Sequence, residues 1–424
     1  MLILDTSGFG SSITQQLTGN CKGYSFELRR SGTTILTESW GNAVDGQLEG
    51  GSSLPWSSDV NMNIASCSKL VTAIALTKII NESPAGLSAD DLIHPYLPSY
   101  WNPGQNVELI TFTDVMTQTS GLKPGPSGFS QTYVPCREAV EAGVIAANLG
   151  GAAQRNYNHW DYENTNFVLC RILMATVSGA VSVGMTGKQP TSPPIILGNK
   201  HLTPQQADDV VWDFETTQFY TQYVQEHIFT PAAVSASLDR PGNCALAYGW
   251  NVAGTSNPAD NKGDGSRGWN DGDVIAFPGN PGFNSSLADW AGPSGWHMSV
   301  SALLDVMGTF RRAGTIMSPE AAQAMLDASF GIDWGDNGVP QTSAVGPLYI
   351  KNGGDSGQDG AGNTAWEQSG AVFLPLDMEC VAFVNSSVWP SSFFLLTTIA
   401  NAFIGNLVES PVIVGPGGHP TSPV

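Results

Sequence analysis

The strongest constraint on the fold is a run of mostly apolar residues that begins beside a lysine. Apolar side chains recur there at helical spacing and form one broad stripe, made of Leu70, Val71, Ala73, Ile74, Leu76, Ile79 and Ile80. The pattern predicts a helix from about Ser66 to Asn81. Because this helix is apolar almost all round, we expect it to be buried at the centre of the protein.

Two serines and a lysine stand at the head of this helix, in the order Ser66, Cys67, Ser68 and Lys69. Residues three apart share a helix face, so Ser66 and Lys69 meet while Ser68 points elsewhere. A desolvated lysine loses its charge and can take the proton of a serine hydroxyl. The alternative is a surface lysine beside a capping serine. Cys67 adjoins Ser66 on a tightly packed helix, so we expect a free thiol there.

Composition excludes some classes of partner. The 17 Lys and Arg residues against 37 Asp and Glu residues give a net charge of −20, which would repel a phosphate backbone, so nucleic acid is not an expected partner. No apolar stretch approaches the roughly 20 residues that a membrane span needs. The 48 glycines and 27 prolines are typical of a loop-rich globular protein.

The cysteines and histidines do not settle the compartment, and their spacing indicates no metal site. The six cysteines are scattered, and the six histidines show no metal-binding spacing, so we expect no metal and no cofactor. The first residues lack the basic and apolar regions of a signal peptide. This favours the cytoplasm if Met1 is the natural start, and a secreted or periplasmic protein if a leader has been removed ahead of this sequence.

Strand patterns occur at both ends of the chain. Residues 24–41 predict a β-hairpin, and 367–373 and 379–385 predict paired strands. Between these ends lie predicted helices, and 180–200 and 252–295 are predicted as long surface loops. The sequence therefore predicts an α+β fold: an antiparallel sheet built from both termini, flanked by helices and interrupted by a helical region. The helices are expected at 111–118, 137–148, 164–178, 204–228, 299–312 and 391–408.

This arrangement predicts where the chain divides. Residues 1–63 and 206–410 would form the sheet domain, and 64–205 would form the helical region that carries the Ser66 motif. Residues 411–424, which are rich in glycine and proline, would be a flexible tail.

Two further motifs accompany the Ser66 motif. Tyr162-Glu163-Asn164 stands at the start of a predicted helix, and Lys351-Asn352-Gly353-Gly354 ends a strand-like run. In this order, the three motifs resemble those of the serine β-lactamase and penicillin-binding-protein superfamily, whose motifs meet in one cleft. The Tyr-x-Asn form is similar to the class C branch, which includes DD-peptidases, D-aminopeptidases and carboxylesterases. The resemblance runs from about residue 23 to about 408.

The resemblance implies a role for each motif. Ser66 would be the acylated nucleophile, Lys69 its proton-transfer partner and Tyr162 a phenolic acid or base. Which of Lys69 and Tyr162 is the general base stays open. Asn164 would orient the substrate.

The third motif, Lys351-Asn352-Gly353, would supply a cation beside Tyr162. The backbone N–H groups of Ser66 and Gly354 would form the oxyanion hole. Gln368-Ser369-Gly370 competes for this position, because it imitates a His-x-Gly variant found in esterase-like relatives. Charge favours Lys351, since glutamine supplies none. We then expect the segment 354–363 to be looped out as an insertion.

The resemblance implies a serine hydrolase that acts through an acyl-enzyme on a small ester, amide or D-amino-acid peptide. A class C-like β-lactamase is one alternative, and a non-catalytic binding protein that retains the fold is another. The loops that would choose the substrate, and the oligomeric state, are not readable from the sequence.

Overall fold

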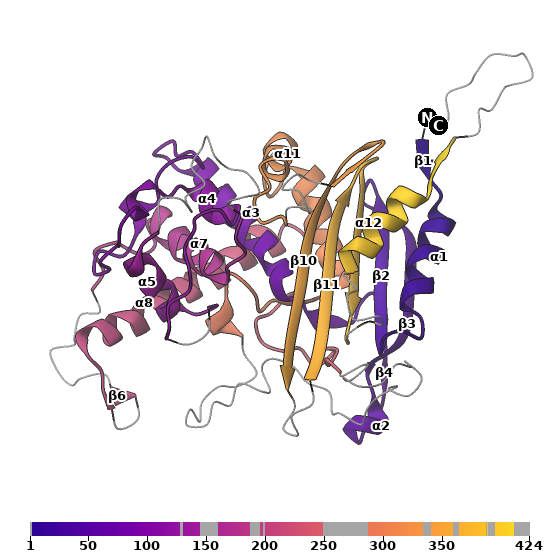
Figure 1. The fold of residues 1–424 in the computed structure, drawn as a ribbon, viewed down its shortest axis with the longest axis horizontal. Coiled ribbons are helices and arrows are strands. Elements are labelled where there is room, and N and C mark those ends of the chain that lie inside the picture. The colour runs from indigo at the N-terminus through magenta and orange to yellow at the C-terminus, as the bar shows by residue number, and fades with distance from the viewer. Residues whose placement is uncertain are drawn as a thin grey trace, which may run out of the picture.

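The computed structural model describes residues 2–127, 130–144, 160–186, 196–197, 200–248, 287–333, 341–358, 364–386, 388 and 395–410. Its centre is a seven-stranded antiparallel sheet with the order β4-β3-β2-β12-β11-β10-β9 (Figure 1). The two central strands β2 and β12 come from opposite ends of the chain, so the predicted α+β fold with a sheet built from both termini is confirmed. The sheet strands are β2 (Gly23–Arg30), β3 (Thr33–Val44), β4 (Leu54–Pro55), β9 (Gln341–Ser343), β10 (Gly346–Gln358), β11 (Thr364–Leu374) and β12 (Met378–Val384).

Helices cover both faces of the sheet. On one face, α1 and α12 pack against each other and against β3, β10 and β11. The other face carries α10 and the helical side of the molecule (Figure 1). The longer helices are α1 (Thr6–Leu17), α3 (Ser68–Glu82), α4 (Phe112–Met116), α5 (Tyr133–Ala142), α7 (Asn164–Val177), α8 (Pro204–Val224), α10 (Val300–Gly308), α11 (Pro319–Asp327) and α12 (Leu395–Gly405).

Short elements complete the described part of the chain. Two pairs of short strands lie outside the main sheet, β1 with β13 and β5 with β8, and a third pair is β6 with β7. Their bounds are β1 (Leu2–Leu4), β5 (Asn61–Asn63), β6 (Ile196–Leu197), β7 (Lys200–His201), β8 (His297–Ser299) and β13 (Leu407–Glu409). The short helices are α2 (Gly46–Glu49), η1 (Ala65–Cys67), η2 (His94–Tyr96), η3 (Val107–Leu109), η6 (Gln225–Phe229), η8 (Ala288–Trp290) and η9 (Thr309–Ala313).

Alternation along β11 separates two hydrophobic cores. Ala371 and Phe373 belong to the core shared with the helical side, whereas Val372 and Leu374 belong to the core under α1 and α12. Successive side chains of a strand point to opposite faces, so this assigns a face to every residue of β11.

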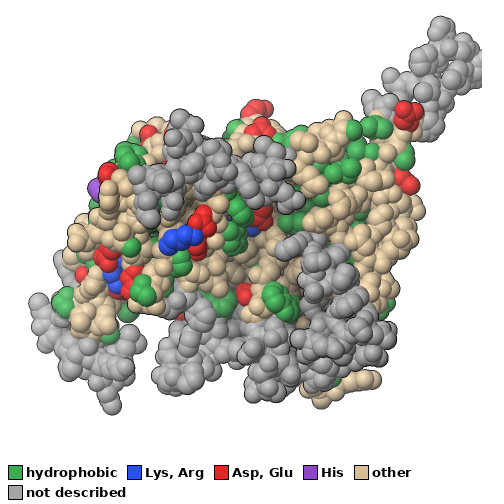
Figure 2. Space-filling view, in the orientation of Figure 1, with side chains coloured by type: hydrophobic (Ala, Val, Ile, Leu, Met, Phe, Trp, Pro, Cys, Tyr) green, Lys and Arg blue, Asp and Glu red, His purple; other side chains and the backbone are tan. Residues whose placement is uncertain are grey.

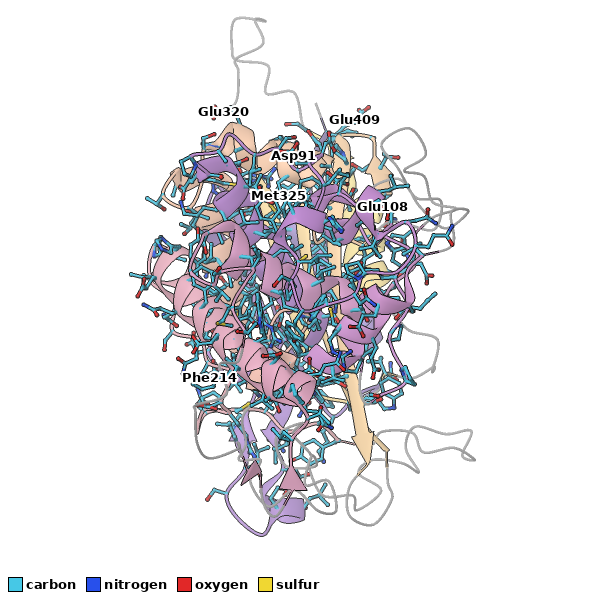
Figure 3. All side chains as sticks on the ribbon, turned by 90° about the vertical axis from the view of Figure 1, so that its left-hand side faces the viewer. Asp91, Glu108, Phe214, Glu320, Met325 and Glu409 are labelled. Atoms are coloured by element: carbon cyan, nitrogen blue, oxygen red, sulfur yellow. The ribbon has the colours of Figure 1, made fainter. Side chains whose placement is uncertain are left out.

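Helix α3 lies at the centre of the helical side, as its apolar pattern predicts. Twelve of its fifteen residues are buried, and it packs against α7 and α8. Helix α8 also contacts α5 and α7, so the helical side extends beyond the boundary predicted at residue 205. Figure 3 looks onto this side, with Phe214 of α8 and Glu320 of α11 at opposite ends. Every helix in the described segments is too short or too polar to span a bilayer.

Several predicted elements need correction. Helix α5 begins at Tyr133 rather than 137, and Gly143, with φ of 77°, ends it. The N-terminal helix α1 has no counterpart among the predicted elements. Residues 287–295, predicted as surface loop, are packed inside, with Trp290 7% exposed and Ala291 fully buried. Residues 251–286 and the predicted tail 411–424 lie outside the described residues.

The segment 354–363 is not simply looped out. Strand β10 continues to Gln358, and β11 begins at Thr364, its partner in the register. Residues 354–358 therefore extend strand β10 instead of leaving the sheet, and 359–363 lie outside the described residues.

The sheet meets the helical side at the turn before α3. Cys67, a free thiol as predicted, donates through Sγ to the carbonyl of Lys351 over 3.3 Å, and Ser369 Oγ donates to the carbonyl of Ile64 over 2.7 Å. A Cβ on Gly353 would lie 2.3 Å from the carbonyl oxygen of Ile64 and 2.1 Å from Ser369 Oγ. Only glycine lets strand and turn approach this closely.

We therefore expect Gly353→Ala to lower the free energy of unfolding by about 1–3 kcal/mol, the usual cost of an overpacked contact. Urea unfolding measures the change. Gly354→Ala is the matched control, because the nearest atom to its Cβ, the Glu367 carbonyl oxygen, is 3.8 Å away. Equal losses in both variants would contradict this account of the junction.

Candidate active site

Ser66 lies in a tight turn that is held before α3 starts. It belongs to the 3-10 turn η1 (Ala65–Cys67), which directly precedes the first residue of α3, Ser68. The preceding residue, Ala65, has φ of +45°, a left-handed conformation that is costly for a residue with a Cβ. Asn63 Oδ1 accepts a 2.9 Å hydrogen bond from the Ala65 N–H and fixes this geometry. The turn thus presents Ser66 toward the middle of β10, where Lys351 and Gly353 lie against it.

Lys69 is buried beneath Ser66. Its Nζ lies 2.8 Å from Ser66 Oγ and 2.9 Å from the carbonyl oxygen of Pro293, and the residue is only 1% exposed. The shared face predicted for Ser66 and Lys69 is confirmed. Ser68 Oγ points elsewhere and accepts from the Trp296 N–H at 3.4 Å.

Burial, and then the nearby charge of Lys351, hold the pKa of Lys69 well below its usual range. Its amine is therefore disposed to be neutral. With a neutral amine, Ser66 Oγ–H can donate to Lys69 Nζ while Lys69 donates to Pro293. This is the arrangement that a general base requires.

Tyr162 approaches Ser66 from the other side. Its hydroxyl donates to Ser66 Oγ over 2.6 Å, and its ring centroid lies 4.9 Å from Lys69 Nζ and 5.3 Å from Lys351 Nζ. Burial raises the pKa of Tyr162, Lys351 lowers it and Asp333 raises it again, with a net pKa above the ordinary value. The phenol is thus protonated at neutral pH and is placed to donate a proton.

Asn164 is the first residue of α7, two positions after Tyr162. Its Nδ2 donates to Ser130 Oγ over 3.4 Å. Its buried Oδ1 has no hydrogen-bond partner among the described residues. Since a buried carbonyl oxygen without a partner is costly, this atom is available to accept an N–H of a bound molecule.

Lys351, on strand β10, also lies at the site, with its Nζ over the ring of Tyr162. Its side chain is 2% exposed, and its Nζ donates to Asp333 Oδ1 over 2.6 Å. Asp333 Oδ2 accepts the N–H of Asn352 over 2.7 Å. The ion pair holds the pKa of Lys351 above its usual value despite burial, which alone would lower it. Lys351 therefore keeps its charge next to Tyr162.

The register of the sheet separates Lys351 from its competitor Gln368. Lys351 pairs with Ala371, which faces the helical side. Gln368 pairs with Val384, which faces α1 and α12. The side chain of Gln368 therefore points to the face of the sheet that lies away from Ser66.

The N–H of Gly354 is directed toward the edge of β10 that faces the site. The N–H of Asn352 points to Asp333 across this edge, and backbone N–H groups two residues apart on a strand share a direction. The Asn352 side-chain Oδ1 is buried without a partner among the described residues. The backbone thus offers Gly354 in the direction that an oxyanion donor needs.

The structure adds two participants that no motif indicated: Asp333 and the Pro293 carbonyl. Asp333 precedes the third motif by 18 residues, and Pro293 comes 224 residues after Lys69. Neither position carries a spacing pattern that links it to Ser66. The Gly292-Pro293 turn could have been noticed only as a tight turn.

A family model, Beta-lactamase, matches residues 11–188. No curated protein matches the sequence.

Solved structures of the same fold are similar over nearly the whole chain. A penicillin-binding protein homologue from Pyrococcus abyssi has 17% identity and a TM-score of 0.57, covering 95% of this chain and 78% of its own. EstCE1, a hydrolase with promiscuous acyltransferase activity, has 14% identity and a TM-score of 0.58, covering 94% of this chain and 99% of its own. D-amino acid amidase from Ochrobactrum anthropi has 14% identity and a TM-score of 0.53, with 93% and 96% covered.

The fold is therefore the one shared by β-lactamases and transpeptidases. The Beta-lactamase family model matches the part of the chain that carries Ser66, Lys69 and Tyr162, and the likeness to the solved structures extends the shared fold over nearly the whole chain.

The lowered pKa of Lys69 predicts where kcat/KM rises on the acid side of its pH profile. If neutral Lys69 is the base, kcat/KM for an uncharged ester rises with pH through the pKa of Lys69, well below the ordinary value of 10.5. Lys351→Ala removes a repelling charge, so the pKa of Lys69 increases and this limb moves to higher pH. An unmoved limb in Lys351→Ala would count against Lys69 as the titrating group.

The opposite faces of Lys351 and Gln368 predict unequal effects. We expect Lys351→Ala to lower kcat/KM by about tenfold or more, because a cation beside the phenol is lost. We expect Gln368→Ala to stay within about twofold of the parent. The measurement is kcat/KM of both variants on the same ester. A large loss of kcat/KM in Gln368→Ala would refute the assignment of the third motif to Lys351.

Proposed function

We propose that this protein is a serine hydrolase that cleaves a small ester or amide through an acyl-enzyme on Ser66. The observation that carries the proposal is the pair of short contacts at Ser66 Oγ, with Lys69 Nζ at 2.8 Å and the Tyr162 hydroxyl at 2.6 Å. A serine hydroxyl is a weak nucleophile until a neighbouring base takes its proton. A surface lysine beside a capping serine would be neither buried nor in contact with a second proton donor.

The groups around Ser66 divide the work of acylation. Lys69 takes the proton of Ser66 as Oγ bonds to the carbonyl carbon. The oxygen of the tetrahedral intermediate accepts from the N–H groups of Ser66 and Gly354. As the bond to the leaving group breaks, Tyr162 gives it a proton, and the proton held by Lys69 passes to Tyr162.

Deacylation reverses these roles. Water attacks the acyl carbon, its proton goes to Tyr162 or Lys69, and Ser66 leaves with a proton returned by the same groups. The buried Oδ1 of Asn164 would accept an N–H of the acyl group when the substrate carries one. This would favour amide-containing substrates.

The similar structures support this reaction class without choosing the substrate. They include an amidase and an esterase-type hydrolase. We therefore place a neutral ester or a D-amino-acid amide first. β-Lactam hydrolysis and binding without turnover are the outcomes that a substrate panel would separate.

The test combines labelling and turnover. A fluorophosphonate should label Ser66, located by peptide mass spectrometry, and p-nitrophenyl esters, D-amino-acid amides and nitrocefin form the panel. We expect Ser66→Ala to lose labelling and turnover, and Tyr162→Phe to lower kcat by about 10²-fold or more. Ser68→Ala is the matched control and should keep activity.

Three results would reject the proposal. One is a label on Ser68, another is undiminished turnover in Ser66→Ala, and the third is an intact, folded protein that reacts with neither probe nor panel. Nitrocefin as the best substrate would reassign the protein to β-lactam hydrolysis with the same nucleophile.

A further inference from the structure

The cation of the third motif is engaged by an acid that belongs to none of the three motifs. Asp333 binds Lys351 with one carboxylate oxygen and the Asn352 N–H with the other, at 2.6 and 2.7 Å. Its own N–H donates to the carbonyl of Ile350 over 2.8 Å. Three contacts to consecutive residues of β10 hold Asp333 in place. The charge of Lys351 is therefore neutralised locally and is not left for an anionic ligand.

A second acid lies on the same face of β10. Residues 351, 353 and 355 alternate onto one face of the strand, so Asp355 points to the side that carries Lys351. Asp355 is near enough to raise the pKa of Lys69. Glu367, opposite Asp355 in the register, is buried, and burial followed by the charge of Asp355 raises its pKa well above the usual range.

Among the described residues around Ser66, the positive charge of Lys351 is therefore balanced by Asp333. Lys351 is the one of them that stays cationic, because burial disposes Lys69 to be neutral. Asp333 lies against Lys351 and cancels its charge. A ligand carboxylate would have to displace Asp333 or lie beside it, and like charges in a partly buried site repel strongly.

We propose that Asp333 is a specificity-determining residue that makes the site discriminate against acyl donors with a carboxylate beside the scissile bond. The substrate class is then neutral esters and amides, or substrates that carry an amine. The proposal rests on the proposed function, because it concerns molecules that react at Ser66. Asp333 acts through Lys351 and is a positioning residue for it.

Matched boronic acids test the discrimination directly. Phenylboronic acid and 3-carboxyphenylboronic acid both bond to a reactive serine and differ by one carboxylate. Their inhibition constants are measured by competition with fluorophosphonate labelling of Ser66. We expect the wild-type protein to bind the carboxylate compound more weakly than the neutral one. Asp333→Asn should lower the ratio of the two constants about tenfold, because it keeps the shape of the side chain and frees the charge of Lys351.

Asp327→Asn is the matched control. Asp327 is an exposed acid on α11 that accepts from Gln323 Nε2 over 2.9 Å and from the Tyr349 hydroxyl. Tyr349 is two residues before Lys351 on the same strand. The control removes one negative charge without touching Lys351, so the ratio should stay unchanged.

A pH profile separates this role from a merely structural one. The groups that act on the pKa of Lys69 are Lys351, Asp333, Asp355 and Cys67; of these, Lys351 lowers it and Asp333 raises it. Asp333→Asn should therefore move the acid limb of kcat/KM to lower pH, opposite to Lys351→Ala. A local loss of structure has no reason to shift the two variants in opposite directions.

The outcomes are distinct. A wild-type protein that prefers the carboxylate compound overturns the inference without any variant, even if Asp333→Asn does not fold. An unchanged ratio in a folded Asp333→Asn overturns it as well. A protein whose Ser66 takes no label refutes the proposed function, and this inference with it.

Discussion

The close contact between the Ser66 turn and strand β10 is the constraint on which the site depends. Gly353 removes the side chain that would keep them apart, and the Cys67 thiol and Ser369 hydroxyl join turn to strand. Lys69 is carried on the helix that starts at this turn, and Lys351 on the strand. Tyr162 reaches both from the segment just before α7. If the contact opened, Ser66 and Lys351 would move apart, since Ser66 is fixed to the turn and Lys351 to the strand.

Burial of Lys69 lowers its pKa and so favours the neutral amine that a general base needs. A lysine in water would be protonated and useless as a base, so the molecule places Lys69 in an apolar helix and sets a second lysine nearby. The second lysine needs a partner of its own, and Asp333 provides it. As a result, burial favours the neutral form of Lys69, whereas Lys351 keeps its charge and is paired with Asp333. Figure 2 shows how few charged side chains the described surface carries on one face of the molecule, in keeping with a chain in which only 13% of residues are charged.

Much of this site was predictable because local patterns carry it. The spacing of Ser66 and Lys69 needed only helical geometry, and the apolar stripe placed α3 at the centre. Tyr162 and Lys351 were found through the order of three motifs, since each motif alone is weak. Asp333 and the Pro293 carbonyl could not be found, because they reach the site through contacts between distant parts of the chain. The choice between Lys351 and Gln368 needed the strand register, where a shift by one residue exchanges the two faces. Helix α1 was missed because its glycines and serines dilute the apolar pattern.

The two sides of this contact lie far apart in the sequence, which affects the order in which the site forms during synthesis. Cys67 and Lys351 are separated by 284 positions, and the strand β2 that begins the sheet must wait for β12 before it gains its second neighbour. During synthesis from the N-terminus, Ser66 and Lys69 emerge long before the strand against which they finally pack. Contacts between such distant segments are slow to form. A nascent or interrupted chain therefore holds Ser66 and Lys69 without the Gly354 N–H and the Lys351 cation, and the four groups come together only as the last strands join the sheet.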